Sequence, residues 1–261
     1  MKITPLIFFL LFFVYSLKTS AQLPDLKGKK MHLYLLVGQS NMAGRGKVEE
    51  ADRAPHSRIW MLNKANEWVP AVAPLHFDKP AAGVGPGLPF AQIMVEADTN
   101  VIIGLIPAAA GGSAMEAWQP GGYHDQTKSH PYDEAIRRAK IAMQSGRLKG
   151  ILWHQGESDS KPELVAGYTA KLTTLIGHFR KELSARKVPV VVGTLGDFFV
   201  NRIPEAKAIN DQLRSLPQKV RHTACVEAAG LTDLGDKTHF DTPSAYELGR
   251  RYAEAMKMLQ K

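Results

Sequence analysis

Apolar runs typical of strands alternate with amphipathic helical patterns, and this alternation constrains the fold of the chain more than any other feature. Continuous apolar runs occur at 31–37, 101–106, 150–154, 188–193 and 224–228. Hydrophobic residues recur at helical spacing over 88–97, 131–145, 164–183, 206–216 and 243–259. Strands that are apolar on both faces and separated by helices are typical of a parallel sheet covered on both sides. The pattern therefore predicts a three-layer α/β/α sandwich with right-handed crossovers.

The first 21 residues differ in character from the rest of the chain. Lys2 precedes an apolar run over 6–17, and small residues at 19–21 offer a cleavage site. This is the layout of a secretory signal peptide, and the run is short for a bilayer span. We expect residues 22–261 to form one folded domain, periplasmic or secreted, that has no membrane contact after cleavage. An uncleaved N-terminal anchor is the alternative.

The charge of the chain does not indicate a nucleic-acid partner. The formal net charge is +8, and Lys2 and Lys18 lie in the segment that we expect to be removed. The other basic residues are spread along helical patterns, not gathered in a stripe with interleaved aromatic residues, so we interpret them as solvated surface. A mild preference for acidic polysaccharide is the alternative that the charge leaves open. The single cysteine, Cys225, lies in an apolar stretch and is expected to be a buried structural thiol. The sequence indicates no oligomeric state.

A nucleophile is predicted where the first apolar strand ends. The strand runs directly into a glycine-flanked turn that carries Ser40. Such a turn exposes the hydroxyl group of a serine in an α/β enzyme. Far along the chain, His239 would act as the general base and Asp236 would orient its imidazole. Glu157, which also follows an apolar strand, is the alternative partner for His239.

Acyl transfer also requires hydrogen-bond donors for the oxyanion. The predicted donors are the backbone N–H of Ser40, the N–H of Gly112 or Gly111, and the side-chain amide of Gln155. We expect Gly112 in preference to Gly111, because a glycine there leaves its N–H open. No Cys/His cluster has metal-ligand spacing, so neither a metal site nor a cofactor is expected.

Four segments in this order resemble the sequence blocks of the SGNH (GDSL-like) hydrolases. They are 38–44, 110–113, 153–159 and 236–239. The likeness is strongest to the branch of sialate O-acetylesterases and carbohydrate esterase family 6, which includes acetylxylan esterases. The resemblance implies a flavodoxin-like SGNH fold and metal-independent hydrolysis of acetyl esters on carbohydrates. Gln155 stands where the wider family has asparagine.

The substrate prediction is less specific than the reaction prediction. Asn41 and Gly111 are expected beside the substrate, although Asn41 could instead support the turn of Ser40. Trp118 follows the segment 110–113, which we call the glycine loop, and would either stack on a sugar or belong to the core. We expect an acetylated, acetylxylan-like carbohydrate as substrate. The alternatives are a sialic acid O-acetylesterase and a non-catalytic carbohydrate-binding protein.

Overall fold

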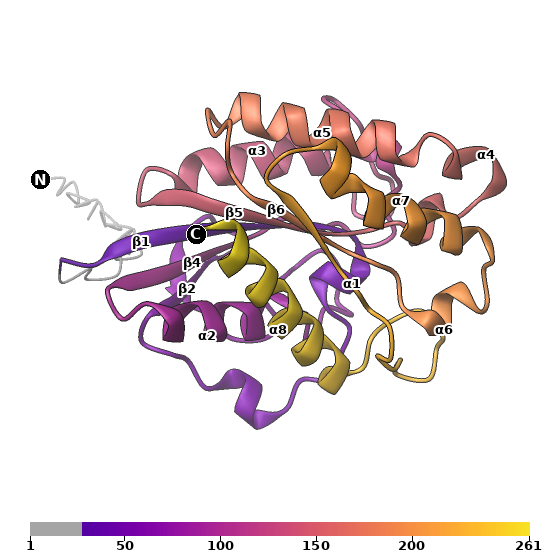
Figure 1. Ribbon diagram of the computed structural model, residues 1–261. Coiled ribbons are helices and arrows are strands. Elements are labelled where there is room, and N and C mark those ends of the chain that lie inside the picture. The colour runs from indigo at the N-terminus through magenta and orange to yellow at the C-terminus, as the bar shows by residue number, and fades with distance from the viewer. Residues whose placement is uncertain (1–27) are drawn as a thin grey trace, which may run out of the picture.

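The computed structural model describes residues 28–261 and shows the predicted three-layer sandwich (Figure 1). Within these residues one sheet has the strand order β3-β2-β4-β1-β5-β6-β7. Its strands are β1 (Lys30–Gly38), β2 (Ile59–Leu62), β3 (Trp68–Pro70), β4 (Val101–Pro107), β5 (Arg147–His154), β6 (Val190–Gly193) and β7 (Thr223–Val226). Every pairing is parallel except that of β2 with β3. The predicted signal peptide lies outside the described residues.

Helices cover both faces of the sheet (Figure 1). One face carries α3 (Pro131–Ala142), α5 (Tyr168–Glu182) and α7 (Glu205–Lys219), and the other carries α2 (Gly87–Ala97) and α8 (Thr242–Leu259). The shorter elements are α1 (Ser40–Ala43), α4 (Pro162–Val165), α6 (Asp197–Val200) and the 3₁₀ turns η1 (Glu50–Arg53), η2 (Met115–Trp118) and η3 (Glu157–Asp159). None of the helices within residues 28–261 is both long enough and apolar enough to cross a membrane.

The central strand β1 is buried on both faces, which explains its continuous apolar sequence. Leu33, Leu35 and Val37 belong to the core on the α3, α5 and α7 side. Tyr34 and Leu36 belong to the core on the α2 and α8 side. Successive strand residues point to opposite faces, so a strand between two helical layers requires apolar residues at every position.

The helix predicted over 164–183 is two helices in the structure. Helix α4 ends at Val165 and α5 begins at Tyr168, with Gly167 between them. Glycine is about 1 kcal/mol less favourable than alanine inside a helix, so the chain breaks there at little cost. The break lets the Tyr168 hydroxyl donate to the Gln155 carbonyl oxygen at 2.7 Å. Helix α5 is thereby tied to the end of β5.

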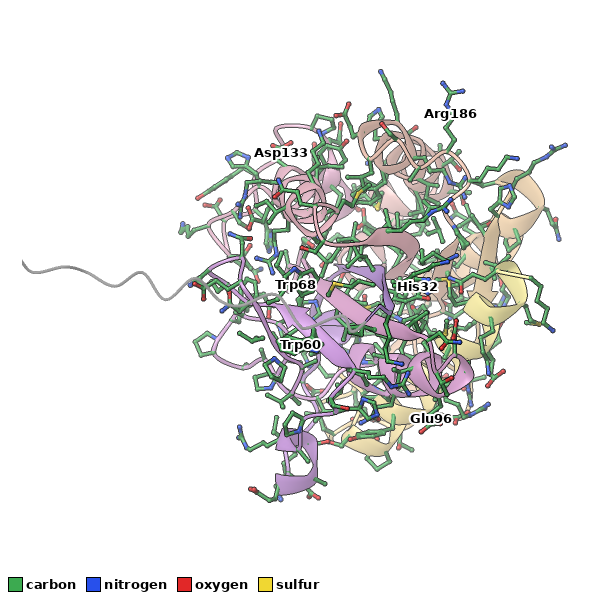
Figure 2. The ribbon with its side chains drawn as sticks, turned by 90° about the vertical axis from the view of Figure 1, so that its left-hand side faces the viewer. His32, Trp60, Trp68, Glu96, Asp133 and Arg186 are labelled. Atoms are coloured by element: carbon green, nitrogen blue, oxygen red, sulfur yellow. The ribbon has the colours of Figure 1, made fainter. Side chains whose placement is uncertain are left out.

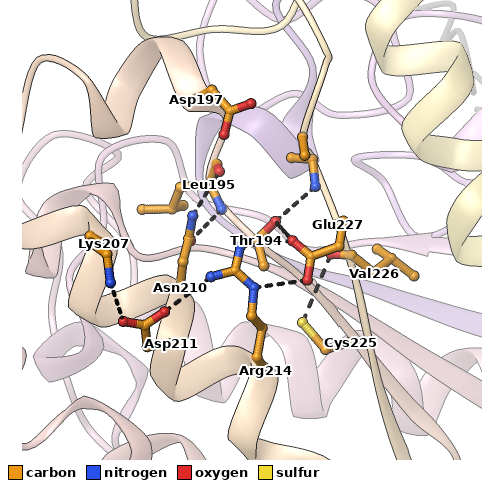
Figure 3. A network of polar contacts seen from close by, with 12 residues as sticks. Thr194, Leu195, Asp197, Lys207, Asn210, Asp211, Arg214, Cys225, Val226 and Glu227 are labelled. Carbon is orange, nitrogen blue, oxygen red and sulfur yellow. Dashed lines mark hydrogen bonds and ion pairs between the residues drawn. The ribbon is translucent and has the colours of Figure 1, made fainter.

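A polar network joins α7 to the segments that follow β6 and β7 (Figure 3). The Asn210 side chain on α7 pairs with both the N–H and the carbonyl oxygen of Leu195, at 2.7 and 3.0 Å. Arg214, one turn further along α7, makes two hydrogen bonds of 2.9 Å to the Glu227 carboxylate. Cys225 lies beside this network, and burial raises the pKa of its thiol to about 12. The thiol therefore stays protonated at neutral pH, in keeping with a structural role.

A fully buried arginine joins β2, β4 and α3. Arg138 donates hydrogen bonds to the carbonyl oxygens of Leu62, Asn63 and Pro107 at 2.6, 3.0 and 2.9 Å. Its side chain has no solvent exposure, and burial lowers its pKa to about 10. Leu62 and Pro107 are the last residues of β2 and β4, and Asn63 follows β2. The guanidinium thus supplies hydrogen-bond donors to carbonyl groups at the ends of these strands.

We expect Arg138→Met to lower the free energy of unfolding by about 3 kcal/mol, because buried carbonyl oxygens lose their donors. The neighbouring Arg137→Met is the matched control. Arg137 is half-exposed and pairs with Glu134 on the same helix, so its loss should cost less than about 1 kcal/mol. Urea denaturation of both variants measures the difference, and equal losses would contradict the role given to Arg138.

Candidate active site

Ser40 lies at the carboxyl end of the central strand. It opens the short helix α1, and 6% of its surface is exposed. The preceding Gly38 has φ +128° and pairs with His154 of β5. A Cβ at Gly38 would collide with the carbonyl oxygen of His154. Glycine therefore allows the close approach of β1 and β5 from which the chain turns into α1.

His239 reaches Ser40 from a loop almost two hundred residues further along the chain. Its Nε2 lies 3.0 Å from the Ser40 Oγ, and its Nδ1 lies 2.6 Å from Asp236 Oδ2. The other carboxylate oxygen, Oδ1, accepts the backbone N–H groups of Thr238 and His239, both at 2.8 Å. Asp236 therefore holds the imidazole and shapes the loop that carries it.

The charge of Asp236 is favoured by these bonds. Burial by itself would raise the pKa of this carboxyl, but the hydrogen bonds from the His239 side chain and from two backbone N–H groups outweigh it and lower the pKa. Asp236 is therefore ionised at neutral pH and can stabilise a protonated imidazole.

Asn41 fastens the His239 loop to the Ser40 turn. Its Nδ2 donates to the Thr238 carbonyl oxygen at 3.0 Å, and its Oδ1 accepts the Phe240 N–H at 3.1 Å. The amide thus pairs with the residues on both sides of His239. Its second N–H donates to Glu157 Oε1 at 2.5 Å. Both N–H groups and the oxygen are engaged within the protein, so the Asn41 side chain supports the His239 loop and has no N–H left for a substrate.

Glu157 contacts Asn41 and not the imidazole. The structure thus separates the two carboxylates considered for His239: Asp236 bonds the ring, and Glu157 bonds the amide that holds the loop. Glu157 Oε2 is buried, with no hydrogen-bond partner among residues 28–261. Burial raises the pKa of Glu157 to about 7, although the Asn41 hydrogen bond acts in the opposite direction.

Two backbone N–H groups near Ser40 are free to donate. Those of Ser40 and Gly112 find no acceptor within the described part of the chain. Gly112 has φ +87°, a conformation that favours glycine, and the Ser158 hydroxyl holds its carbonyl oxygen at 2.9 Å. The Gly111 N–H instead donates to Asp78 Oδ2 at 2.9 Å. Between the two glycines, Gly112 therefore has the available donor.

The Gln155 amide is occupied elsewhere. Its Nε2 donates to the Ser113 carbonyl oxygen at 3.0 Å and to Asp159 Oδ2 at 2.6 Å, and the side chain is fully buried. Both N–H groups are used, so none is left for an oxyanion. This corrects the expectation for Gln155. The amide connects the end of β5 to the glycine loop.

Trp118 belongs to the core. It is 1% exposed, its Nε1 donates to the Ser113 Oγ at 2.8 Å, and its ring meets that of Trp153 edge to face at 5.1 Å. A ring enclosed in this way cannot stack on a sugar, so the core alternative holds. Gly111, also expected beside the substrate, is packed against Arg45 and Asp78.

Sequence reasoning did not single out the residues that support the glycine loop. Asp78 forms a buried ion pair with Arg45 at 2.8 Å and holds the Gly111 N–H. Ser158 holds the Gly112 carbonyl oxygen. Ser158 lies inside the 153–159 segment, where its hydroxyl group was the available signal. Asp78 lies in an irregular region with no pattern to mark it.

A cavity of about 310 Å³ adjoins this loop. Ala110, His76, Asp78 and Arg138 are among its lining residues. Asp78 Oδ1 and the His76 ring nitrogens are buried without a hydrogen-bond partner among residues 28–261. Burial lowers the pKa of His76 to about 4, so its ring is neutral at pH 7. Residues 28–261 contain no group of three or more His, Cys, Asp or Glu side chains that could hold a metal ion.

The chain is similar to known carbohydrate esterases in sequence and in fold. Residues 30–258 match the family model described as carbohydrate esterase, sialic acid-specific acetylesterase. A probable carbohydrate esterase of Arabidopsis thaliana is 32% identical over 247 residues, which cover 85% of this chain and 89% of that protein. The X-ray structure of the Arabidopsis thaliana protein superposes with a TM-score of 0.78 at 28% identity and covers 88% of this chain and 98% of that one.

Two further solved structures share the fold. NanS has a TM-score of 0.72 at 17% identity, covering 88% of this chain and 98% of its own. A carbohydrate acetylesterase from Xanthomonas citri has a TM-score of 0.65 at 21% identity, covering 88% of this chain and 56% of its own. The fold is that of the SGNH-type hydrolases. The chain belongs to the carbohydrate esterase, sialic acid-specific acetylesterase family, and is a carboxylic ester hydrolase.

The raised pKa of Glu157 predicts a pH dependence of stability. Its pKa is about 7 in the folded protein, against an ordinary value of 4.5. The folded state holds the proton more tightly, so this contribution to stability is complete below pH 4.5 and is lost as the pH rises to 7. Glu157→Gln keeps an acceptor for Asn41 and should make the variant more stable relative to wild type at pH 7 than at pH 4.5, by up to about 3 kcal/mol.

Chemical denaturation at several pH values measures this difference. Glu163→Gln on the exposed surface of α4 is the control. Parallel curves for wild type and Glu157→Gln would contradict the assignment.

Proposed function

We propose that this protein removes acetyl groups from a carbohydrate by a two-step mechanism in which Ser40 is the nucleophile. The observation that carries the proposal is the continuous contact from Ser40 Oγ through His239 to Asp236, with distances of 3.0 and 2.6 Å. Membership of an acetylesterase family supports the same reaction. A binding protein would not need a hydroxyl group placed against a base, which argues against the non-catalytic alternative.

In the first step the Ser40 Oγ attacks the ester carbonyl carbon while His239 Nε2 accepts its proton. The negative charge that develops on the carbonyl oxygen would be met by the N–H groups of Ser40 and Gly112. Collapse of the intermediate breaks the bond to the sugar oxygen, which takes the proton back from His239. In the second step His239 activates a water molecule, which attacks the acetyl-serine and releases acetate.

The cavity beside the glycine loop supports a neutral sugar, as in acetylated xylan. Its volume lies at the lower end of the range of about 300–1,000 Å³ for small-molecule pockets. The unpartnered oxygen of Asp78 can accept a sugar hydroxyl. The charged side chains that line the cavity are two cations, Lys64 and Arg138, and two anions, Asp78 and Glu134, so the lining has no excess of positive charge to attract the carboxylate of a sialic acid. The family description keeps O-acetylated sialic acid as the second candidate substrate.

We also propose that residues 1–21 direct export of the protein. The support for this is the sequence pattern of a basic start, an apolar run and small residues before Gln22.

The first experiment is acetate release from acetylated xylo-oligosaccharides and from O-acetylated sialic acid. Ser40→Ala should lower kcat by about 10³-fold or more on the active substrate, because no nucleophile remains. Ser57→Ala, at an exposed position away from the site, is the matched control. Faster release from the xylo-oligosaccharides supports the neutral sugar, and faster release from sialic acid supports the second candidate. Unchanged activity in Ser40→Ala would overturn the mechanism.

Asp236→Asn tests the orientation of the base. The amide keeps the size of the side chain but removes the charge that stabilises a protonated His239, so kcat should fall by about 10²–10⁴-fold. Asp233→Asn is the control, because Asp233 lies in the same loop and accepts the N–H groups of Gly235 and Lys237 without contacting the imidazole. Equal effects of the two substitutions would show that Asp236 only shapes the loop.

A further inference from the structure

A groove with a volume of about 1050 Å³ lies at the amino ends of β5 and β6. We call it the basic groove, because six cationic side chains line it: Arg147, Lys149, Arg180, Lys181, Arg186 and Lys187. Parallel strands all begin on the same side of the sheet, so this groove lies at their amino ends and Ser40 lies at their carboxyl ends. Figure 2 faces the amino ends of the strands, and Arg186 projects there from the surface of the molecule.

The positive charge of the basic groove is not neutralised by the protein. Its lining contains no Asp or Glu side chain. Within residues 28–261 none of its six cations forms an ion pair. Glu182, which follows Lys181, pairs with Lys140 at 3.4 Å. Arg180 is held in the wall by the carbonyl oxygens of Val188, Arg221 and His222. The other five cations therefore remain available to an anionic ligand.

The pKa of His32 on β1 is lowered in part by the same positive charge. Burial is the main cause that lowers the pKa of its imidazole, and Lys149 lowers it next most. Lys30 and Arg147 add to the effect, while Asp98 acts in the opposite direction. Two cations of the groove, Lys149 and Arg147, thus act on the same neighbouring imidazole.

The shape and composition of the groove narrow the class of ligand. A concave surface fits a polymer strand better than the plane of a membrane. The lining has no Phe, Tyr or Trp side chain on which nucleic-acid bases could stack. Arginine binds carboxylate and sulfate groups through paired N–H donors, and lysine adds point charges.

We propose that the basic groove is a second binding site, which takes an acidic polysaccharide through its carboxylate or sulfate groups. The polymer chain would lie along the groove with its anionic groups on Lys181, Arg186 and Lys187, which are exposed. Such a site would hold the protein on a charged polymer while the opposite edge of the sheet stays open to ester substrates. It goes beyond the proposed esterase function and does not depend on it.

The test is binding of the full chain to polygalacturonate, measured by isothermal titration calorimetry over a range of salt concentrations. Fully methyl-esterified polygalacturonate is the matched ligand control, since it has the same backbone without the charge. Polygalacturonate carries no ester group, so its binding is measured independently of esterase activity. Charge-mediated binding should weaken as salt rises, because salt screens exposed charges.

The decisive variant is the double substitution Arg186→Glu with Lys187→Glu. Reversing two exposed charges should weaken binding to polygalacturonate by about ten-fold at low salt. Lys47→Glu with Arg53→Glu makes the same change in net charge at exposed positions outside the groove. This control pair should bind as wild type does. Circular dichroism and thermal unfolding check that each variant is folded.

Several outcomes would overturn the proposal. Equal weakening by both double variants would show an effect of net charge alone. Equal binding of the methyl-esterified polymer would show that carboxylates are not recognised. Binding to anionic phospholipid vesicles or to duplex DNA, with none to polygalacturonate, would assign the groove to a membrane or a nucleic acid instead.

Discussion

The position of β1 between β4 and β5 is the constraint on which the rest of the structure depends. Its backbone pairs with both neighbours, and its side chains are buried on both faces. Because β1 is hydrogen-bonded on both sides and packed on both faces, it gives the turn at Ser40 a rigid base. The same pairing brings the loops after β4 and β5 to that turn, and these loops supply Gly112 and Ser158. The geometry of the Ser40 turn is therefore a consequence of how the sheet packs.

Around this base, polar side chains connect segments that lie far apart in the sequence. Asn41 joins the Ser40 turn to both sides of His239, and Gln155 joins β5 to the glycine loop. Asn41 uses both N–H groups and its oxygen within the protein, and Gln155 uses both N–H groups, while its buried Oε1 has no partner among the described residues. Buried amides have a high cost when unpaired, so such networks hold one arrangement of the loops. The result is a site in which a few groups stay open for chemistry, because many others are committed to holding them.

The parallel sheet also separates the two regions that carry function in our proposals. Strand carboxyl ends carry Ser40, the glycine loop and the cavity beside Asp78. Strand amino ends carry the basic groove. Because of this separation, a polymer bound in the basic groove does not compete with an ester bound beside Ser40. It also means that charge at the groove acts on the ester site only over a distance at which salt screens it.

The sequence by itself predicted the class of fold, and it singled out the Ser40 turn and the Asp-x-x-His segment, which the structure brings into contact. These follow from local patterns: apolar runs, helical periodicity, and glycine beside Ser40. It did not separate Asp236 from Glu157, and it misassigned Gln155, because both questions ask which acceptor a side chain meets across the fold. It also described the basic residues as spread out, whereas the sheet gathers those of 147–149 with those of 180–187. Local patterns record what each segment can form, but only tertiary packing decides which polar groups are already paired and which remain free.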